Sequence, residues 1–172
     1  CKQSHLTSDL DSGISSDYTY THAINMGSGT NVTVNGVIFT AEGNGATTNS
    51  GTNWTITSGF NAHLNDGWMA ARSQYHSTAL GNVGTLMSKG FRYNADPQKL
   101  KLSGLTDGQA YVFAIYNQAW SGGIRNFDIS CSDMAGSIRM NQDQYNSDTF
   151  DGLLLECTYI ADGTDVEFTI DP

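Results

Sequence analysis

The chain has 172 residues, with 8 Lys and Arg against 17 Asp and Glu, and its formal net charge is -9. This length suits a single domain that can bury a sizeable core. Nucleic-acid binding depends on clustered cations, so the acidic balance argues against a nucleic-acid partner. Every apolar run is far shorter than a membrane-spanning helix requires, and we expect no transmembrane segment.

The residue types favour strands over helices. Charged residues make up only 15% of the chain, and 19 Gly together with many Ser, Thr and Asn take their place. Thr, Tyr, Val and Ile suit a pleated, half-buried surface, whereas the strongest helix formers are sparse. The composition therefore predicts an all-β fold whose strands are joined by polar turns.

The first 16 residues form a polar leader, CKQSHLTSDLDSGISS, without sustained periodicity. Such a segment is ordered only where something holds it, either its own sheet or a neighbouring molecule. We therefore divide the chain into the leader, residues 1–16, which could act as a donor strand, and a β-domain over residues 17–172.

After the leader, apolar side chains alternate in short runs that are separated by Gly, Asn and Asp. The Asn35-Gly36 step predicts a hairpin, and helical spacing of Leu80, Val83 and Leu86 predicts one short helix near 79–89. About nine or ten short strands predict a jelly-roll-like β-sandwich. The expected strands lie at 18–22, 32–34, 37–39, 54–56, 100–102, 111–115, 127–131, 138–140, 153–157 and 166–170.

The three cysteines, Cys1, Cys131 and Cys157, lack the spacing of a metal site. Cys131 and Cys157 both lie in expected strands, so a disulfide between them is one prediction and two buried thiols are the alternative. A mature chain that begins at Cys1 is typical of a bacterial lipoprotein, and the alternative is an arbitrary start. Cys1 is accordingly a candidate for a lipid anchor or a crosslink.

Several segments, in this order, carry a resemblance to a known family: SGISSDYTYTHAINMG, VNGVIFTA, GFRYNADPQKLKL, LKLSGLTDGQAYVFAIYNQAW followed by Arg125, and LLLECTYIADGTDVEFTI. From about Ser12 onward the chain resembles secreted jelly-roll domains of environmental bacteria, especially planctomycetes and verrucomicrobia. These domains are similar to carbohydrate-binding modules and are often attached to surface or polysaccharide-degrading proteins. The resemblance implies an extracellular or cell-surface location and contact with glycans.

The resemblance also implies an incomplete sandwich. Relatives continue past the segment that matches TDVEFTIDP into a further apolar strand, whereas this sequence stops at Pro172. A missing strand would leave an open sheet edge, and a strand donated by a neighbouring subunit can cover such an edge. The leader is the available donor.

No combination of residues indicates catalysis. Glu42, Glu156 and Glu167 are the only glutamates, and they form no evident acid and base pair. The four histidines lack paired metal-binding spacing, and no Ser occupies a nucleophile-elbow motif. We therefore expect that the protein is not an enzyme and needs no cofactor.

Three kinds of binding or modification site remain as candidates. Trp68, Tyr116 and Trp120 are candidate stacking platforms for sugar rings, although Trp120 also fits a core or capping role. Asp9 and Asp11 form a DxDxG string that could hold calcium, with a capped turn as the alternative. Asn31 and Asn53 begin glycosylation sequons, which in a bacterial protein can also arise by chance.

Two functions follow from these observations. The first is a secreted structural subunit of an extracellular filament, in which the leader of one copy inserts into the next copy. The second is a monomeric carbohydrate-binding module of a surface or polysaccharide-degrading protein. The position of residues 1–16 separates the two hypotheses, because a donor strand lies in another chain.

Overall fold

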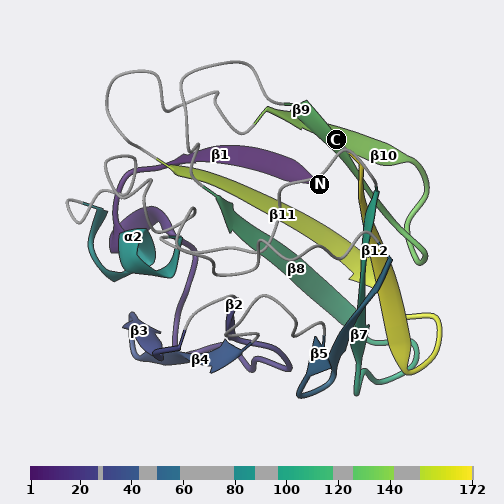
Figure 1. Ribbon diagram of the computed structural model, residues 1–172, viewed down its shortest axis with the longest axis horizontal. Helices are drawn as coiled ribbons and strands as arrows, with labels where there is room; N and C mark the ends of the chain where they lie inside the picture. The colour runs from purple at the N-terminus through teal and green to yellow at the C-terminus, as the bar shows by residue number, and fades with distance from the viewer. Residues whose placement is uncertain are drawn as a thin grey trace.

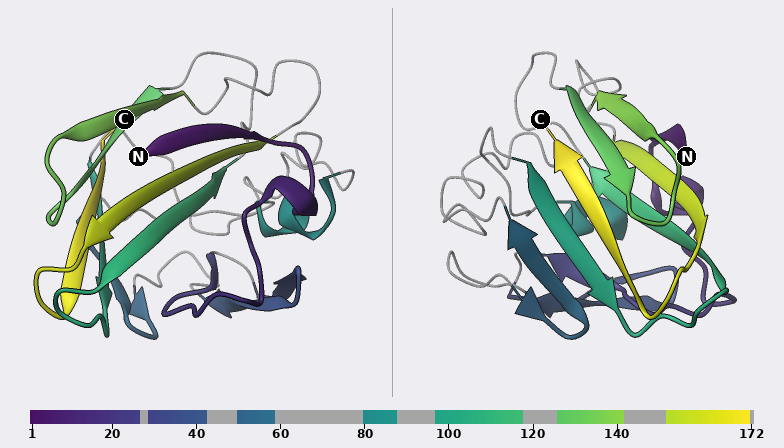
Figure 2. Two further views of the ribbon diagram at one scale, coloured as in Figure 1. Left: turned by 180° about the vertical axis from the view of Figure 1, so that it is seen from behind. Right: turned by 90° about the vertical axis from the view of Figure 1, so that its right-hand side faces the viewer.

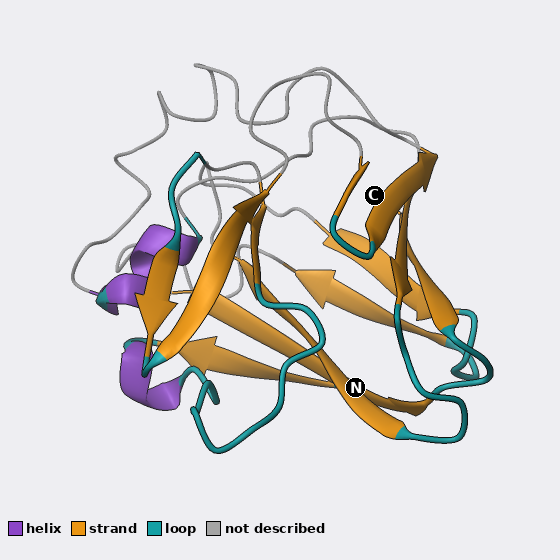
Figure 3. Cartoon of the chain, turned by 90° about the horizontal axis from the view of Figure 1, so that it is seen from below, coloured by secondary structure: helices purple, strands orange, loops and turns teal. Residues whose placement is uncertain are grey.

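The computed structural model describes residues 1–26, 29–42, 50–58, 80–87, 97–117, 126–141 and 152–171. Strands dominate these residues, as Figure 3 shows, and the expected all-β, sandwich-like fold is confirmed. The strands are β1 (Lys2–Leu6), β2 (Ile24–Met26), β3 (Val32–Val34), β4 (Val37–Glu42), β5 (Ser50–Gly51), β6 (Trp54–Ser58), β7 (Gln98–Ser103), β8 (Ala110–Asn117), β9 (Asn126–Cys131), β10 (Ser137–Asn141), β11 (Gly152–Ile160) and β12 (Asp165–Asp171). A 3-10 turn, η1 (Asp9–Asp11), and a short helix, α2 (Asn82–Leu86), complete the described elements.

The strands form three sheets. The large sheet has the order β10-β9-β12-β7-β6-β5, the central sheet β1-β11-β8, and the small sheet β2-β4-β3. All described pairings are antiparallel except that of β2 with β4. Figures 1 and 2 show β1, β11 and β8 side by side, with the large sheet at one end and the small sheet and α2 toward the other. β12 pairs with both β7 and β9, so the last strand is an inner strand of the large sheet.

Strand β11 lies between two hydrophobic clusters. Leu153, Leu155 and Cys157 on one face belong to the main cluster with residues of the large sheet, whereas Leu154 on the other face belongs to a second cluster with the small sheet and α2. Side chains of neighbouring strand residues point to opposite faces, so the run from Gly152 to Leu155 is buried on both sides. Full burial of each leucine contributes about 1.5–3 kcal/mol.

Aromatic packing connects the central and large sheets. Phe168 of β12 stacks on Phe113 of β8 with ring centroids 3.7 Å apart, and Tyr159 of β11 meets Phe168 edge-on. Trp54 of β6 lies in the same cluster and is buried, as its alternation with Ile56 predicts. These large side chains fill the space between the sheets.

The structure confirms the predicted hairpin and the predicted short helix, but it lacks one predicted strand. Asn35 and Gly36 both have positive φ, at 47° and 83°, and join β3 to β4 as the hairpin signal predicts. Helix α2 lies within the predicted span 79–89. The strand expected at 18–22 is wrong, because Ser15 organises a turn in which its carbonyl accepts from the Tyr18 amide at 3.2 Å.

The leader is part of its own domain. Residues 2–6 form β1, which pairs antiparallel with β11 of the same chain from Lys2 opposite Glu156 to Leu6 opposite Gly152. Ser12 and Ile14, further along the leader, are buried. We expected the leader to be held either by its own sheet or by a neighbouring molecule. In this structure it pairs with its own sheet.

Salt bridges line the outer face of the large sheet. Lys99 Nζ lies 3.0 Å from Glu167 Oε1, and Lys101 Nζ lies 2.6 Å from Asp165 Oδ2. The hydrogen bond from Lys99 lowers the pKa of the Glu167 carboxyl, partial burial opposes this change, and a hydrogen bond from Thr57 adds to the lowering. Glu167 is thus ionised below the pH at which an unfolded glutamate titrates.

We expect the Glu167→Gln variant to lose stability at neutral pH and to differ less from the original chain in acid. A carboxyl with a lowered folded pKa stabilises the protein above its unfolded pKa, here 4.5, and loses this contribution as the pH falls through the folded pKa. Urea denaturation at several pH values between about 7 and 3 measures the difference in unfolding free energy. A Lys99→Met variant should show the same trend, and a difference that stays constant across this range would contradict the prediction.

Candidate functional site

One face of the central sheet is covered over only part of its length. On the face that points away from the large sheet, Leu6 and Leu154 pack with Tyr116 and Ala114 against the small sheet and α2. Further along the same strands this cover ends, and Val112 of β8 remains 61% exposed. The uncovered part of this face is the candidate site.

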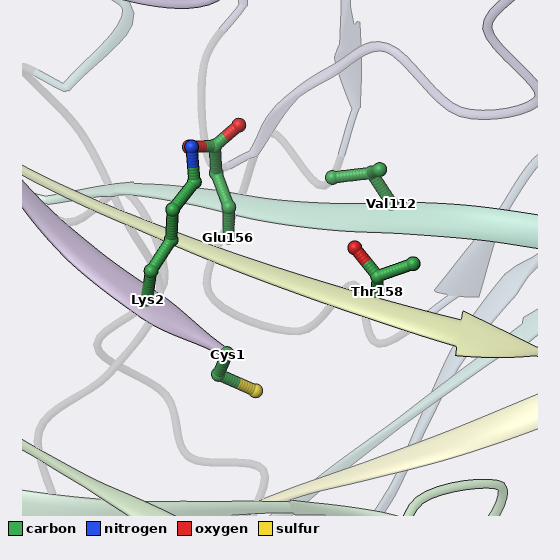
Figure 4. Close-up of a pocket in the computed structure, with 5 residues that line it drawn as sticks. All are labelled: Cys1, Lys2, Val112, Glu156 and Thr158. Carbon is green, nitrogen blue, oxygen red and sulfur yellow. The ribbon is translucent and has the colours of Figure 1, made fainter.

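The uncovered part contains a hollow of about 300 Å³. Three strands contribute to it, and Figure 4 shows the side chains that line it. Register explains the grouping, because Lys2 of β1 lies opposite Glu156 of β11 and Thr158 of β11 lies opposite Val112 of β8. The lining residues are Cys1, Lys2, Val112, Glu156 and Thr158.

An ion pair forms the polar side of the hollow. Lys2 Nζ lies 2.7 Å from Glu156 Oε2, and the Glu156 side chain is 22% exposed while that of Lys2 is 71% exposed. The other carboxylate oxygen, Oε1, faces the leader, since a Cβ placed on Gly13 would lie 3.6 Å from it. Ammonium, carboxylate and the Thr158 hydroxyl together offer both donors and acceptors beside the apolar Val112 side chain.

A disulfide joins the hollow to the core. Cys1 is bonded to Cys157, 156 residues later, and Cys157 is completely buried, whereas Cys131 is a free buried thiol. The predicted bond between Cys131 and Cys157 is therefore wrong. Cys131 lies in the large sheet and Cys157 in the central sheet, and facing sheets are about 10 Å apart, whereas cross-strand neighbours within one sheet have Cβ atoms about 5 Å apart. Because β1 pairs with β11, Cys1 is such a neighbour.

The disulfide also bears on the roles predicted for Cys1. A sulfur that is bonded to Cys157 cannot also carry a thioether-linked lipid, so the lipid anchor and this disulfide exclude each other. The crosslink in the structure lies within one chain. For Cys131, burial raises the thiol pKa, which keeps this side chain protonated and unreactive.

Tyr116 is half-buried and has a packing role. Its hydroxyl donates to the Ser12 carbonyl at 2.9 Å, its ring meets Phe39 edge-on with centroids 6.3 Å apart, and burial raises the pKa of its phenol. Alternation along β8 places this residue against the second hydrophobic cluster, so these contacts do not favour a stacking platform, and its contact with glycans stays a prediction. The other two aromatic candidates, Trp68 and Trp120, lie outside the described residues.

Asp9 and Asp11 cap turns. The Asp9 carboxylate accepts from the backbone amides of Asn82 and Val83 at the start of α2, at 3.1 and 2.7 Å. The Asp11 carboxylate accepts from the amides of Thr7 and Ser8. The capped turn, which was the alternative to a calcium site, is therefore confirmed, and calcium binding by these two residues stays a prediction. No group of three or more metal-binding side chains occurs among the described residues.

The two predicted glycosylation residues lie at the surface. Asn31 is exposed, and its side-chain oxygen accepts from the Ala41 amide at 2.8 Å. Asn53 is exposed and has a positive φ of 61°. Their exposure is compatible with glycosylation, which stays a prediction for both.

None of the protein-family models, curated proteins or solved structures compared with the chain matches it. Within the described residues, no helix has the length and apolar character that a membrane span requires. Function therefore has to be argued from the side chains of the site and their chemistry.

We expect the disulfide to contribute about 2–5 kcal/mol to the free energy of unfolding, because it restricts the unfolded chain between two distant positions. Urea denaturation with and without a dithiol reductant should show this loss in the original chain. Cys1→Ser should show the loss without reductant and no further change with it. Cys131→Ala is the matched control, since it keeps the disulfide and should remain sensitive to the reductant; equal stability in both conditions would contradict the assignment.

Proposed function

We propose that the chain is a non-enzymatic extracellular domain that binds carbohydrate. The observation that carries the proposal is the hollow on the central sheet, where the Lys2 ammonium, the Glu156 carboxylate and the Thr158 hydroxyl lie beside the exposed apolar side chain of Val112. Sugars present the same combination of chemistry, hydroxyl groups that donate and accept hydrogen bonds around apolar C–H faces.

Three features support a neutral glycan. The net charge of -9 would repel a polyanionic chain. Lys2 and Glu156 balance each other's charge, so this ion pair adds no net charge to the hollow. Val112 and Ile160 are 61% and 63% exposed, which supplies apolar surface for the C–H face of a ring.

An extracellular location is supported by the disulfide. Disulfides persist in oxidising environments and are rare in the reducing cytosol. The Cys1–Cys157 bond also places Cys1 and Lys2 beside Glu156, so oxidation completes one wall of the hollow. We therefore place the functional protein outside the cell or on its surface.

We expect the chain to bind neutral polysaccharides in affinity gels and by calorimetry, and Glu156→Gln to weaken binding about tenfold. A hydrogen bond to a charged group contributes about 1.5–3 kcal/mol, and a difference of 1.4 kcal/mol is tenfold in affinity. Thr158→Ala should have a smaller effect in the same direction. Loss of binding in Trp68→Ala with no change in Glu156→Gln would instead assign the glycan to the predicted tryptophan platform.

Lys101→Ala is the matched control for these measurements. Lys101 also carries an exposed ion pair, with Asp165, but it lies on the outer face of the large sheet. Its binding should equal that of the original chain. If no polysaccharide or glycan array shows saturable binding, the proposed function is wrong.

The filament subunit remains a second candidate, and one observation favours it. β1 is an edge strand that pairs with β11 alone among the described strands. β1 of another copy has the same sequence, so it could pair with the same edge of β11. Deletion of residues 1–16 should then abolish any filaments seen by electron microscopy, and Leu6→Asp should do the same in a chain of full length. Filaments that persist in both variants would exclude assembly through this segment.

A further inference from the structure

β1 is held to the domain by its backbone ladder, by contacts of its side chains and by the disulfide that precedes it. Of its five side chains only Leu6 is fully buried, with no exposed surface. Gln3 Nε2 donates to the Arg139 carbonyl of β10 at 2.7 Å, and Lys2, whose side chain is 71% exposed, pairs with Glu156. The Cys1–Cys157 disulfide is thus the strongest single attachment at this end of the strand.

The segment that follows β1 is anchored independently. Asp9 caps α2, and the Asn35 side-chain amide donates to the carbonyls of Asp9 and Ile14 at 2.7 and 3.0 Å. Ser12 is fully buried. These contacts do not involve β1, so the leader consists of a fixed part from Asp9 onward and a separable strand before it.

The short connection at Thr7 and Ser8 lies between these two parts. Three hydrogen bonds to the Asp11 carboxylate hold it, from the Thr7 amide, the Thr7 hydroxyl and the Ser8 amide, at 2.7–2.9 Å. All three hydrogen bonds are exposed to solvent, so water can replace them. Rotation here would move β1 without disturbing the fixed part.

The place that β1 occupies on β11 is specific. Five consecutive residue pairs define the register, and Leu6 packs into the second hydrophobic cluster beside Gly152. A Cβ on Gly152 would lie 2.8 Å from Met87 Cε and 3.1 Å from Leu6 Cδ2, so the glycine leaves the room that Leu6 fills. A strand that fits must therefore carry an apolar side chain at this position and a cysteine opposite Cys157, and β1 of a second copy has both.

From these contacts we infer that the disulfide is a redox lock on β1, and that its reduction lets β1 exchange between two copies of the chain. In the exchanged pair, β1 of each copy adds to β11 of the other in the register described above, and re-oxidation traps Cys1 of one copy on Cys157 of the other. The interaction surface is the edge of β11 with the part of the second hydrophobic cluster that Leu6 contacts, and the partner is the same chain.

The redox chemistry is ordinary thiol–disulfide exchange. A dithiol reductant transfers two electrons and two protons to the Cys1–Cys157 bond, which leaves two protein thiols and one cyclic disulfide of the reductant. In the reverse step a low-molecular-weight disulfide such as oxidised glutathione accepts two electrons. The two protein sulfurs then form one bond between copies, and two glutathione thiols carry away the protons. Exposed Cys1 is the accessible end of the bond, since Cys157 is buried.

Two single-thiol variants test the exchange directly. In a Cys131→Ala background, Cys1→Ser leaves only the Cys157 thiol and Cys157→Ser leaves only the Cys1 thiol. When the two are mixed and oxidised with glutathione disulfide, we expect a covalent heterodimer on a non-reducing gel that is at least tenfold more abundant than the homodimers of either variant alone. Because Cys157 is buried, random collision cannot produce this excess.

Leu6→Asp in the variant that keeps Cys1 is the matched control. It leaves the thiol exposed but removes the apolar side chain that packs into the second hydrophobic cluster, and we expect about a tenfold loss of heterodimer, in line with the free energy of burying one leucine. A heterodimer yield equal to that of the homodimers, or unaffected by Leu6→Asp, would overturn the proposal.

The original chain supplies a second measurement in case a variant does not fold. Unlabelled and ¹⁵N-labelled chains are mixed, reduced, re-oxidised at high concentration and digested without reduction. Mass spectrometry should detect a peptide pair that joins labelled Cys1 to unlabelled Cys157. If every Cys1–Cys157 peptide pair carries the same label on both peptides, β1 returns to its own chain, and this result contradicts exchange. Glycan binding is measured separately, so this result does not affect it.

Discussion

Burial of residues 152–155 of β11 on both faces is the constraint on which the rest of the structure depends. One face of this strand forms the main core with the large sheet, and the other forms the second core with the small sheet and α2. A strand in this position needs partners along both edges, because its amides and carbonyls cannot reach water. β8 satisfies one edge and β1 the other, so the N-terminal segment completes the middle layer of the fold.

The same constraint links the fold to the site. β1 brings Cys1 and Lys2 next to Glu156, and the disulfide fixes them there. Beyond the small sheet the central sheet is uncovered, which leaves a shallow polar and apolar surface built from three strands. A sheet face that is covered at one end and open at the other can stabilise the fold and bind a ligand with the same strands.

Closure by an edge strand also relates the two functions considered. A strand that is held in its own chain gives a self-contained binding domain, and the same strand transferred to a neighbour gives an assembly. The Cys1–Cys157 bond is the one covalent attachment of the β1 end of the chain to β11, so it bears directly on the balance between them. Redox conditions therefore become relevant to the state of the protein.

Local patterns in the sequence determined most of the strands, the Asn35-Gly36 hairpin and the short helix, because alternation and turn chemistry act over a few residues. They did not identify β1, β2 or β5, and they placed a strand at 18–22 that the structure lacks. Tertiary structure decided which strands pair, and with that the partner of Cys157, the burial of Tyr116 and the capping roles of Asp9 and Asp11. No local signal places Lys2 beside Glu156 or Thr158 beside Val112, since register between distant strands arises only when the chain folds. The sequence by itself therefore determined most elements of this sandwich-like fold, and the pairing of β1 with β11, which only the tertiary structure decides, created its candidate site.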